Sequence, residues 1–189
     1  MYLARRPSTA VIERFLQDSR DARLSYGPIG IVDADPLAGA RDHVTVAIGH
    51  GAADFERARA ALMAWQQFDL GWVEVFPRRA PVAAGTVVVV LIRHLGFWSL
   101  NGCRVVYAVG SPNDVARYGY AYGTLTNHAE SGEEAFDVFL DPQTDRVMYR
   151  IRAVSWPQTT LAWIGQPIVR ALQARFREDS AAAMRRAIR

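Results

Sequence analysis

Residues of two kinds, hydrophobic and polar or large and small, alternate with a period of two in several segments of the chain. His43–Ile48 (HVTVAI), Tyr118–Leu125 (YGYAYGTL) and Arg146–Ser155 (RVMYRIRAVS) show this pattern clearly. Because successive side chains of a strand point to opposite faces of a sheet, the alternation predicts β-strands. Four further segments are rich in β-branched and aromatic residues and also predict strands: Gly71–Phe76, Val87–Leu100 with a bend at Gly96–Trp98, Cys103–Val109 and Glu133–Leu140.

Apolar residues at helical spacing predict three helices. The first follows a capping Ser8 or Thr9, the second follows the glycine turn Gly49–Gly51, and the third begins near Pro167. Each helix then repeats its apolar residues every three or four positions, which places them on one face. These residues are Val11, Ile12, Phe15 and Leu16 in the first helix, Phe55, Ala58, Leu62 and Trp65 in the second, and Ile168, Leu172 and Phe176 in the third.

The order of these elements predicts an α+β fold. A strand and a helix are followed by a meander of about six antiparallel strands and then by one long helix. This order is similar to that of the helix-grip (START or Bet v 1-like) superfamily, in which a curved antiparallel sheet wraps around a long C-terminal helix. A lipocalin-like or cystatin-like arrangement is the alternative. We expect a single domain over residues 1–189, with residues 1–42 packed as an N-terminal helical extension on a core of residues 43–189.

The segment Tyr118–Leu125 has two very different faces. Tyr118, Tyr120, Tyr122 and Thr124 share one face, and Gly119, Ala121, Gly123 and Leu125 share the other. Glycine within a strand often marks a place where another group approaches the backbone closely. We therefore expect the small-residue face either to pack against a helix or to form the floor of a cavity.

Composition and charge narrow the class of protein only slightly. Half of the 189 residues are hydrophobic, and the formal net charge of +3 is a weak indication of an anionic partner. A single cysteine, Cys103, excludes an internal disulfide. Val11–Arg20 is too polar for a secretory signal, and the apolar run Thr86–Ile92 is far shorter than the ~20 residues of a membrane-spanning helix. We expect a soluble, cytoplasmic protein.

Several short runs match a known family. The runs are Asn101–Tyr107 (NGCRVVY), Tyr120–Leu125 (YAYGTL), His128–Glu134 (HAESGEE) and the pair Gly71–Trp72. They resemble the uncharacterised protein family 0548, small proteins of bacteria and plants that are described as a domain of unknown function. The resemblance covers nearly the whole chain and implies no particular activity. Departures from the family pattern are Gly27 before Pro28 and Trp156 after Ser155.

The strands around Tyr118–Leu125 hold the residues that we expect at a ligand site. A cavity with a few convergent polar groups is the usual form of such a site. No cofactor and no metal site is indicated, since His128 and Glu130 alone supply only two ligands. The predicted ligand-binding residues are Trp98, Arg104, Tyr107, Tyr118, Tyr120, Tyr122, Thr124 and Glu134.

His128, Glu133 and Arg104 are the candidates for acid–base or anion-holding chemistry. A solvated position at the tip of a hairpin is the simpler interpretation of His128. Glu133 and Glu134 must point to opposite faces of their strand, so at most one of them faces the interior. Arg104 lies within an apolar strand, where a buried charge requires a partner. It would pair with Glu133 or Glu134, or else hold a ligand carboxylate or phosphate.

Three hypotheses for function remain open at this point. The first is a non-enzymatic protein that binds a hydrophobic or amphipathic small molecule, such as a lipid, in an internal cavity. The second is a cyclase, isomerase or hydrolase that uses the same cavity. The third is an interaction module that acts through the arginine-rich C-terminal helix. Glu178 and Asp179 interrupt that helix, which disfavours nucleic acid and leaves peripheral contact with an anionic membrane. The oligomeric state is not indicated.

Overall fold

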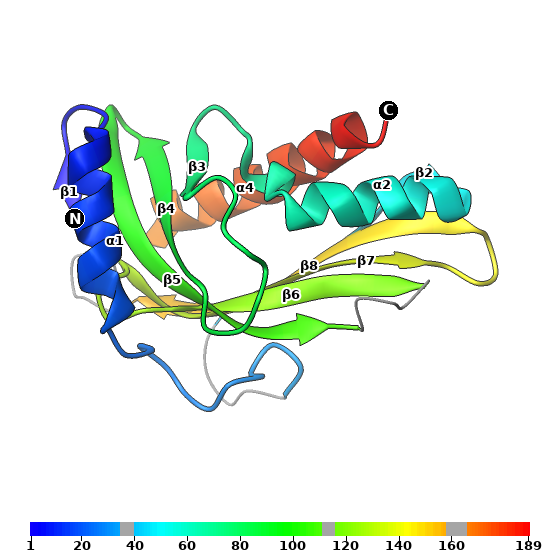
Figure 1. The fold of residues 1–189 in the computed structure, drawn as a ribbon, viewed down its shortest axis with the longest axis horizontal. Coiled ribbons are helices and arrows are strands. Elements are labelled where there is room, and N and C mark those ends of the chain that lie inside the picture. Colours follow the sequence, from blue (N-terminus) through cyan, green and yellow to red (C-terminus); the bar gives the residue numbers. More distant parts are fainter. Residues whose placement is uncertain (35–39, 111–115, 158–165) are drawn as a thin grey trace.

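An antiparallel sheet curves around the C-terminal helix, as Figure 1 shows. The computed structural model describes residues 1–34, 40–110, 116–157 and 166–189. The strands lie in the order β2-β8-β7-β6-β5-β4-β3, and β1 pairs with one end of β5. The elements are β1 (Tyr2–Leu3), α1 (Thr9–Arg20), β2 (Ala40–His50), α2 (Gly51–Met63), the short 3-10 helix η1 (Gln66–Phe68), β3 (Val73–Phe76), β4 (Val87–His94), β5 (Phe97–Val109), β6 (Arg117–Thr124), β7 (Glu130–Leu140), β8 (Arg146–Pro157) and α4 (Gln166–Ala187).

The predicted α+β architecture with a curved sheet and a long C-terminal helix is confirmed. Strands β3 to β8 form the expected meander, in which each strand pairs with the next in antiparallel orientation. Strand β2 then pairs with β8, which brings the beginning and the end of the core together. The first helix begins where its cap predicts, because the Ser8 side chain accepts a hydrogen bond from the Val11 N–H.

The single bent strand expected over Val87–Leu100 is wrong, because this segment is a hairpin. Leu95 and Gly96, with φ of 48° and 81°, form a two-residue turn between β4 and β5. The sequence conceals the turn because β4 is covered on both faces. Val88 belongs to the core beneath α2 and α4, whereas Val89 packs in a second cluster with α1. A strand buried on both sides reads as a continuous apolar run.

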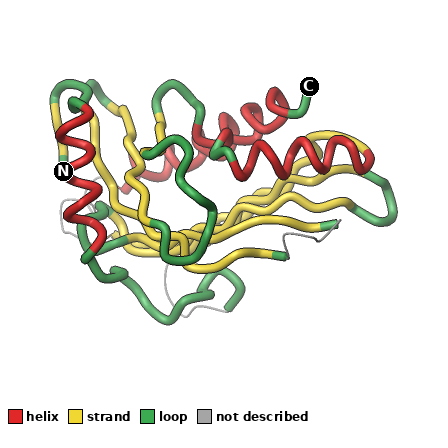
Figure 2. The backbone as a smooth tube through the Cα atoms, viewed as in Figure 1, coloured by secondary structure: helices red, strands yellow, loops and turns green. Residues whose placement is uncertain are grey.

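Helices α2 and α4 cover the concave face of the sheet, and Figure 2 shows both of them on one side of the strands. The main core lies between these two helices and the sheet, and it contains the rings of Phe55, Trp65, Tyr120 and Phe136. Helix α1 packs on the opposite face of β4 and β5, where Phe15 contacts a cluster that includes Trp98. The two clusters place the sheet between two apolar layers at this end of the protein.

The aromatic face of the segment Tyr118–Leu125 turns toward the helices, and its small-residue face is covered by the chain that follows α1. Leu24 forms a bridge with Leu125, and a Cβ placed on Gly123 would collide with the ring of Tyr26. The expectation of a helix or a cavity floor on this face is therefore wrong. The small residues instead make room for a loop that crosses the convex side of the sheet (Figure 2).

Candidate functional site

A cavity of about 670 Å³ lies between the concave face of the sheet and α4. Most of its wall is apolar and comes from η1, β4, β8 and α4. Tyr2, Leu95 and Ile168 also line it, and their side chains are exposed, so the cavity reaches the surface between β1, the β4–β5 turn and the start of α4. The main apolar lining residues are Phe68, Trp72, Val90, Ile92, Ile151, Leu172 and Phe176.

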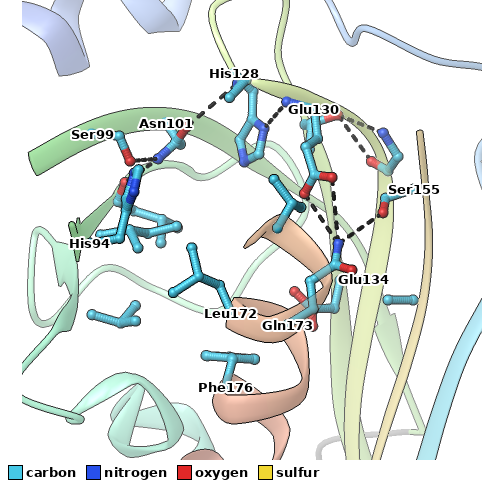
Figure 3. Close-up of a pocket in the computed structure, with 18 of the residues that line it drawn as sticks. His94, Ser99, Asn101, His128, Glu130, Glu134, Ser155, Leu172, Gln173 and Phe176 are labelled. Atoms are coloured by element: carbon cyan, nitrogen blue, oxygen red, sulfur yellow. Dashed lines mark hydrogen bonds between the residues drawn. The ribbon is translucent and has the colours of Figure 1, made fainter. Parts of the chain in front are cut away.

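A carboxylate cluster forms one polar wall of the cavity. Tyr122 and Glu134 are directly opposed on β6 and β7, and the Tyr122 hydroxyl donates a hydrogen bond of 2.5 Å to Glu134 Oε2. Gln173 of α4 donates from Nε2 to Glu130 Oε2 at 3.3 Å and to Ser155 Oγ at 3.2 Å. Figure 3 shows these side chains converging from β7, β8 and α4.

Burial changes the acidity of both carboxyl groups in this cluster. It raises the pKa of Glu134 from the ordinary 4.5 to about 7. The hydrogen bond from Tyr122 opposes that rise, and the negative charges of Glu130 and Asp42 add to it. Burial also raises the pKa of Glu130, against the stabilising hydrogen bond from Gln173. Near neutral pH, Glu134 therefore exchanges readily between its acid and its carboxylate form.

Two arginine residues of α4 lie behind this cluster and are paired with one acidic residue. Arg177 Nη1 is 2.9 Å from Asp42 Oδ2, and Arg170 Nη1 is 3.6 Å from the same oxygen. Asp42 belongs to β2, so the ion pairs join the last helix to the edge strand. Asp42 and Arg177 both line the cavity.

A second polar wall lies across the cavity, beyond Leu172 in Figure 3. Asn101 donates from Nδ2 to Ser99 Oγ at 3.1 Å, and both residues come from β5. His128 accepts a hydrogen bond at Nδ1 from the Glu130 N–H at 2.9 Å, and burial lowers its pKa to about 4. Nδ1 of His94 is buried and has no hydrogen-bond partner among the described residues. His128 lies in the turn between β6 and β7, as expected, but it borders the cavity as a neutral ring, so the solvated environment that we expected is wrong.

Glu133 and Glu134 point to opposite faces, as alternation predicts. Glu133 adjoins the cavity through its place in β7, but its carboxylate is on the convex side. There it accepts hydrogen bonds from Tyr26 Oη at 2.6 Å, from Tyr107 Oη at 2.9 Å and from the Gly30 N–H at 2.8 Å. Burial, the largest cause, and this carboxylate both raise the pKa of the two tyrosines. Tyr107 is thus part of a structural cluster outside the cavity.

Arg104 is also on the convex side, and the pairing with Glu133 or Glu134 that we expected is wrong. Its Nη2 donates hydrogen bonds of 2.9 Å to the carbonyl oxygens of Arg20 and Ala22. These contacts hold the chain that leaves α1 against the sheet. Because Arg104 and the carboxylate of Glu133 face away from the cavity, the catalytic set of His128, Glu133 and Arg104 does not converge on one space.

The other predicted residues divide between the cavity and the core. Tyr122, Thr124 and Glu134 line the cavity, together with His128. Tyr120 is fully buried, where its hydroxyl accepts a hydrogen bond from Gln67, and Tyr118 also belongs to the core. Trp98 packs with α1 on the far face of the sheet. Of the ten residues predicted for ligand binding or catalysis, the structure therefore directs four toward the cavity, namely Tyr122, Thr124, His128 and Glu134.

Several polar residues of the cavity were missed by sequence reasoning. Ser99 and Asn101 lie two positions apart, and they share with Cys103 the inward face of β5. Polar residues at this spacing within a buried strand were the available signal. Gln173 follows Leu172 directly and carried no such signal, because a polar residue beside an apolar helical stripe is common. Among the described residues, no group of three His, Cys, Asp or Glu side chains could hold a metal ion.

In the part of the chain that the structure describes, no helix combines the length and the apolar composition that crossing a bilayer would require.

Solved structures with the same fold have little sequence in common with this chain. A hypothetical protein of Helicobacter pylori superposes with a TM-score of 0.58 at 11% identity, covering 87% of this chain and 95% of its own. An aromatase/cyclase from Streptomyces gives 0.52 at 13% identity, covering 80% and 94%. A START superfamily protein from Mycobacterium smegmatis gives 0.51 at 14% identity, covering 79% and 97%. These likenesses show a START-like helix-grip fold.

Sequence comparisons identify nearer relatives. Residues 25–183 match the family DUF1990, described as a domain of unknown function. A UPF0548 protein of Dictyostelium discoideum is 33% identical over 100% of this chain and 96% of its own. A UPF0548 protein of Deinococcus radiodurans is 35% identical over 93% and 92%. The resemblance in the sequence runs is thus confirmed, and the chain belongs to the uncharacterised protein family 0548.

Proposed function

We propose that this protein binds a hydrophobic or amphipathic small molecule in the cavity between the sheet and α4. The observation that carries the proposal is the cavity itself, which has a volume of about 670 Å³. Its wall is mostly apolar and contains two polar clusters. Ligand sites of proteins are typically about 300–1,000 Å³ and are apolar with a few placed polar groups. A site of this kind recognises an apolar body by burial and its polar ends by hydrogen bonds.

The surface opening supports a cavity that exchanges its contents. Tyr2 is 61% exposed, Leu95 70% and Ile168 46%, yet all three also line the cavity. A contiguous exposed apolar patch often marks a ligand-binding groove. Here they make an apolar entrance that is continuous with an apolar interior.

Native mass spectrometry of freshly purified protein, followed by organic extraction, tests this proposal. We expect a bound apolar molecule that is released by the solvent and can be identified by its mass. A neutral dye such as Nile red serves as the second probe, because it reports an accessible apolar site when the natural ligand has been lost. A clean protein mass combined with no enhancement of dye fluorescence would contradict the proposal.

An isomerase or cyclase that uses this cavity is a second candidate, favoured by Glu134. A general acid or base works best when its pKa is near the working pH, and Glu134 meets that condition inside the cavity. The extracted molecule distinguishes the two functions. If it is returned unchanged after incubation with the protein, binding alone is supported; if a rearranged product accumulates in proportion to time and Glu134→Gln stops it, the enzyme is supported.

The basic C-terminal helix gives less support to an interaction module. Arg177 is paired with Asp42, as described above, and the Arg175 guanidinium lies 4.5 Å from the centre of the Trp72 ring. Arg185 donates from Nε to the Ala47 carbonyl oxygen at 3.3 Å. These arginine residues are therefore used within the protein; peripheral contact of the helix with an anionic membrane stays a prediction, and nucleic acid stays disfavoured.

A further inference from the structure

We propose that the ligand of this cavity is an amphipathic amine whose cationic head binds to Glu134. This inference rests on the proposed binding function and specifies the chemical class of the ligand. It starts from the position of the Glu134 carboxyl group, which is in the wall of the cavity and not on the outer surface.

Glu134 retains unused capacity to accept hydrogen bonds. Among the described residues, the Tyr122 hydroxyl is the one group whose hydrogen bond to Glu134 the structure shows. An ionised carboxylate has two oxygens and about four lone-pair sites. A donor from a bound molecule can therefore reach Glu134 without displacing Tyr122, and an ammonium group supplies three such donors.

The charges around Glu134 favour a cation. Asp42 of β2, Glu130 and Glu134 of β7 face this end of the cavity, and Arg170 and Arg177 of α4 face them. Among the side chains that the structure describes here, three carboxylates against two guanidinium groups leave one unit of negative charge when all are ionised. Both guanidinium groups form ion pairs with Asp42, Arg170 also acts to lower the pKa of Glu130 and Arg177 that of Glu134, and the neutral ring of His128 adds no positive charge. A positive ligand group would restore neutrality where water is largely excluded.

Aromatic rings beside Glu134 suit both parts of such a ligand. The ring centre of Phe68 is 6.0 Å from that of Tyr122 and 5.3 Å from that of Phe176, and all three residues line the cavity. Cations are attracted to aromatic faces, and apolar chains or rings are buried well against them. A carboxylate head would instead meet the repulsion of Glu130 and Glu134, and an alcohol would gain a hydrogen bond but no charge.

The acidity of Glu134 adds a pH signature to the proposal. An ammonium ion binds the carboxylate form, and a pKa of about 7 means that this form is scarce at pH 6 and dominant at pH 8. The affinity for an amine should therefore rise by about tenfold between pH 6 and pH 8 and then level off, with protons released on binding. The affinity for a neutral ligand should change little over the same range.

Three probes with one apolar body test the head group: 4-phenylbutylamine, 4-phenylbutanol and 4-phenylbutyrate. Isothermal titration calorimetry at pH 8 should show the amine binding roughly tenfold or more tightly than the alcohol, and the carboxylate most weakly. In Glu134→Gln the preference for the amine over the alcohol should disappear while the alcohol still binds. Glu178→Gln makes the same chemical change at an exposed position of α4 outside the cavity, so it should keep the preference and serves as the matched control.

The outcomes separate this inference from the function on which it rests. Equal binding of amine and alcohol, tightest binding of the carboxylate, or an unchanged preference in Glu134→Gln would each overturn the amine assignment while leaving a small-molecule site. Failure of all three probes and of Nile red would overturn the binding function itself. If Glu134→Gln does not fold, the pH dependence of amine binding to the unaltered protein decides, because a flat profile between pH 6 and pH 8 contradicts a role for Glu134.

Discussion

Tyr122 and Glu134 face each other across neighbouring strands, and the tyrosine hydroxyl donates a 2.5 Å hydrogen bond to the carboxyl group inside the cavity. This short contact stabilises the charged form of Glu134, whereas burial favours the neutral form more strongly. The balance places the titration of Glu134 near pH 7, where both forms are accessible to a ligand.

The same balance predicts a stability effect for Glu134→Gln. Because the pKa is about 7 in the folded protein and near 4.5 in the unfolded chain, the folded state binds the extra proton between these values. The contribution of Glu134 to stability is therefore present below pH 4.5 and is lost as the pH rises to 7. We expect the variant to gain about 3 kcal/mol relative to the original protein between pH 4.5 and pH 8. Urea unfolding followed by tryptophan fluorescence measures the difference; a constant difference across this range would contradict it.

His128→Asn should show the opposite pH dependence. The pKa of His128 is lowered to about 4 by burial from an ordinary 6.5, so the unfolded chain binds the proton first as the pH falls. The free energy of unfolding of the original protein should decline from pH 6.5 toward pH 4, and the decline should be about 2 kcal/mol smaller in the variant. Asparagine can still accept the hydrogen bond from the Glu130 N–H. Parallel stability curves for the two proteins would show that His128 is solvated after all.

Leu172→Trp should block the cavity. Leu172 projects from α4 between the two polar walls in Figure 3, and an indole at this position would occupy much of the space. We expect the affinity for Nile red to fall by roughly tenfold or more while the protein remains folded. Trp98→Phe is the control, since Trp98 lies on the other side of the sheet. Loss of dye binding in the control, with retention in Leu172→Trp, would place the site elsewhere.

Arg104→Met should affect stability but not binding. Removal of the guanidinium leaves the carbonyl oxygens of Arg20 and Ala22 without these donors, and it should cost about 1–2 kcal/mol in the free energy of unfolding. Dye affinity, measured on the same samples, should be unchanged because Arg104 is outside the cavity. A variant of normal stability that binds the dye weakly would restore Arg104 to the ligand site.

Sequence patterns predicted the order of strands and helices better than the contacts between distant segments. Alternation separated Glu133 from Glu134 correctly, because the faces of a strand are fixed by its geometry alone. Alternation could not predict the partners of Arg104, because the carbonyl groups of Arg20 and Ala22 carry no side-chain signal and lie more than 80 residues away along the chain. The face of Gly123 was misjudged for the same reason: the ring that fills it belongs to Tyr26, in an irregular segment without periodicity.

The opposed carboxyl groups of Glu133 and Glu134 also protect the alignment of β7. A slip of one residue would exchange their faces, turning the carboxylate held by Tyr26 and Tyr107 toward the apolar interior and removing Glu134 from Tyr122. Both hydrogen-bonded clusters would be lost together, at the cost of buried polar groups on either side of the sheet. Two adjacent acidic residues thus disfavour the neighbouring alignments of β7, because each alignment would leave both clusters without their hydrogen bonds.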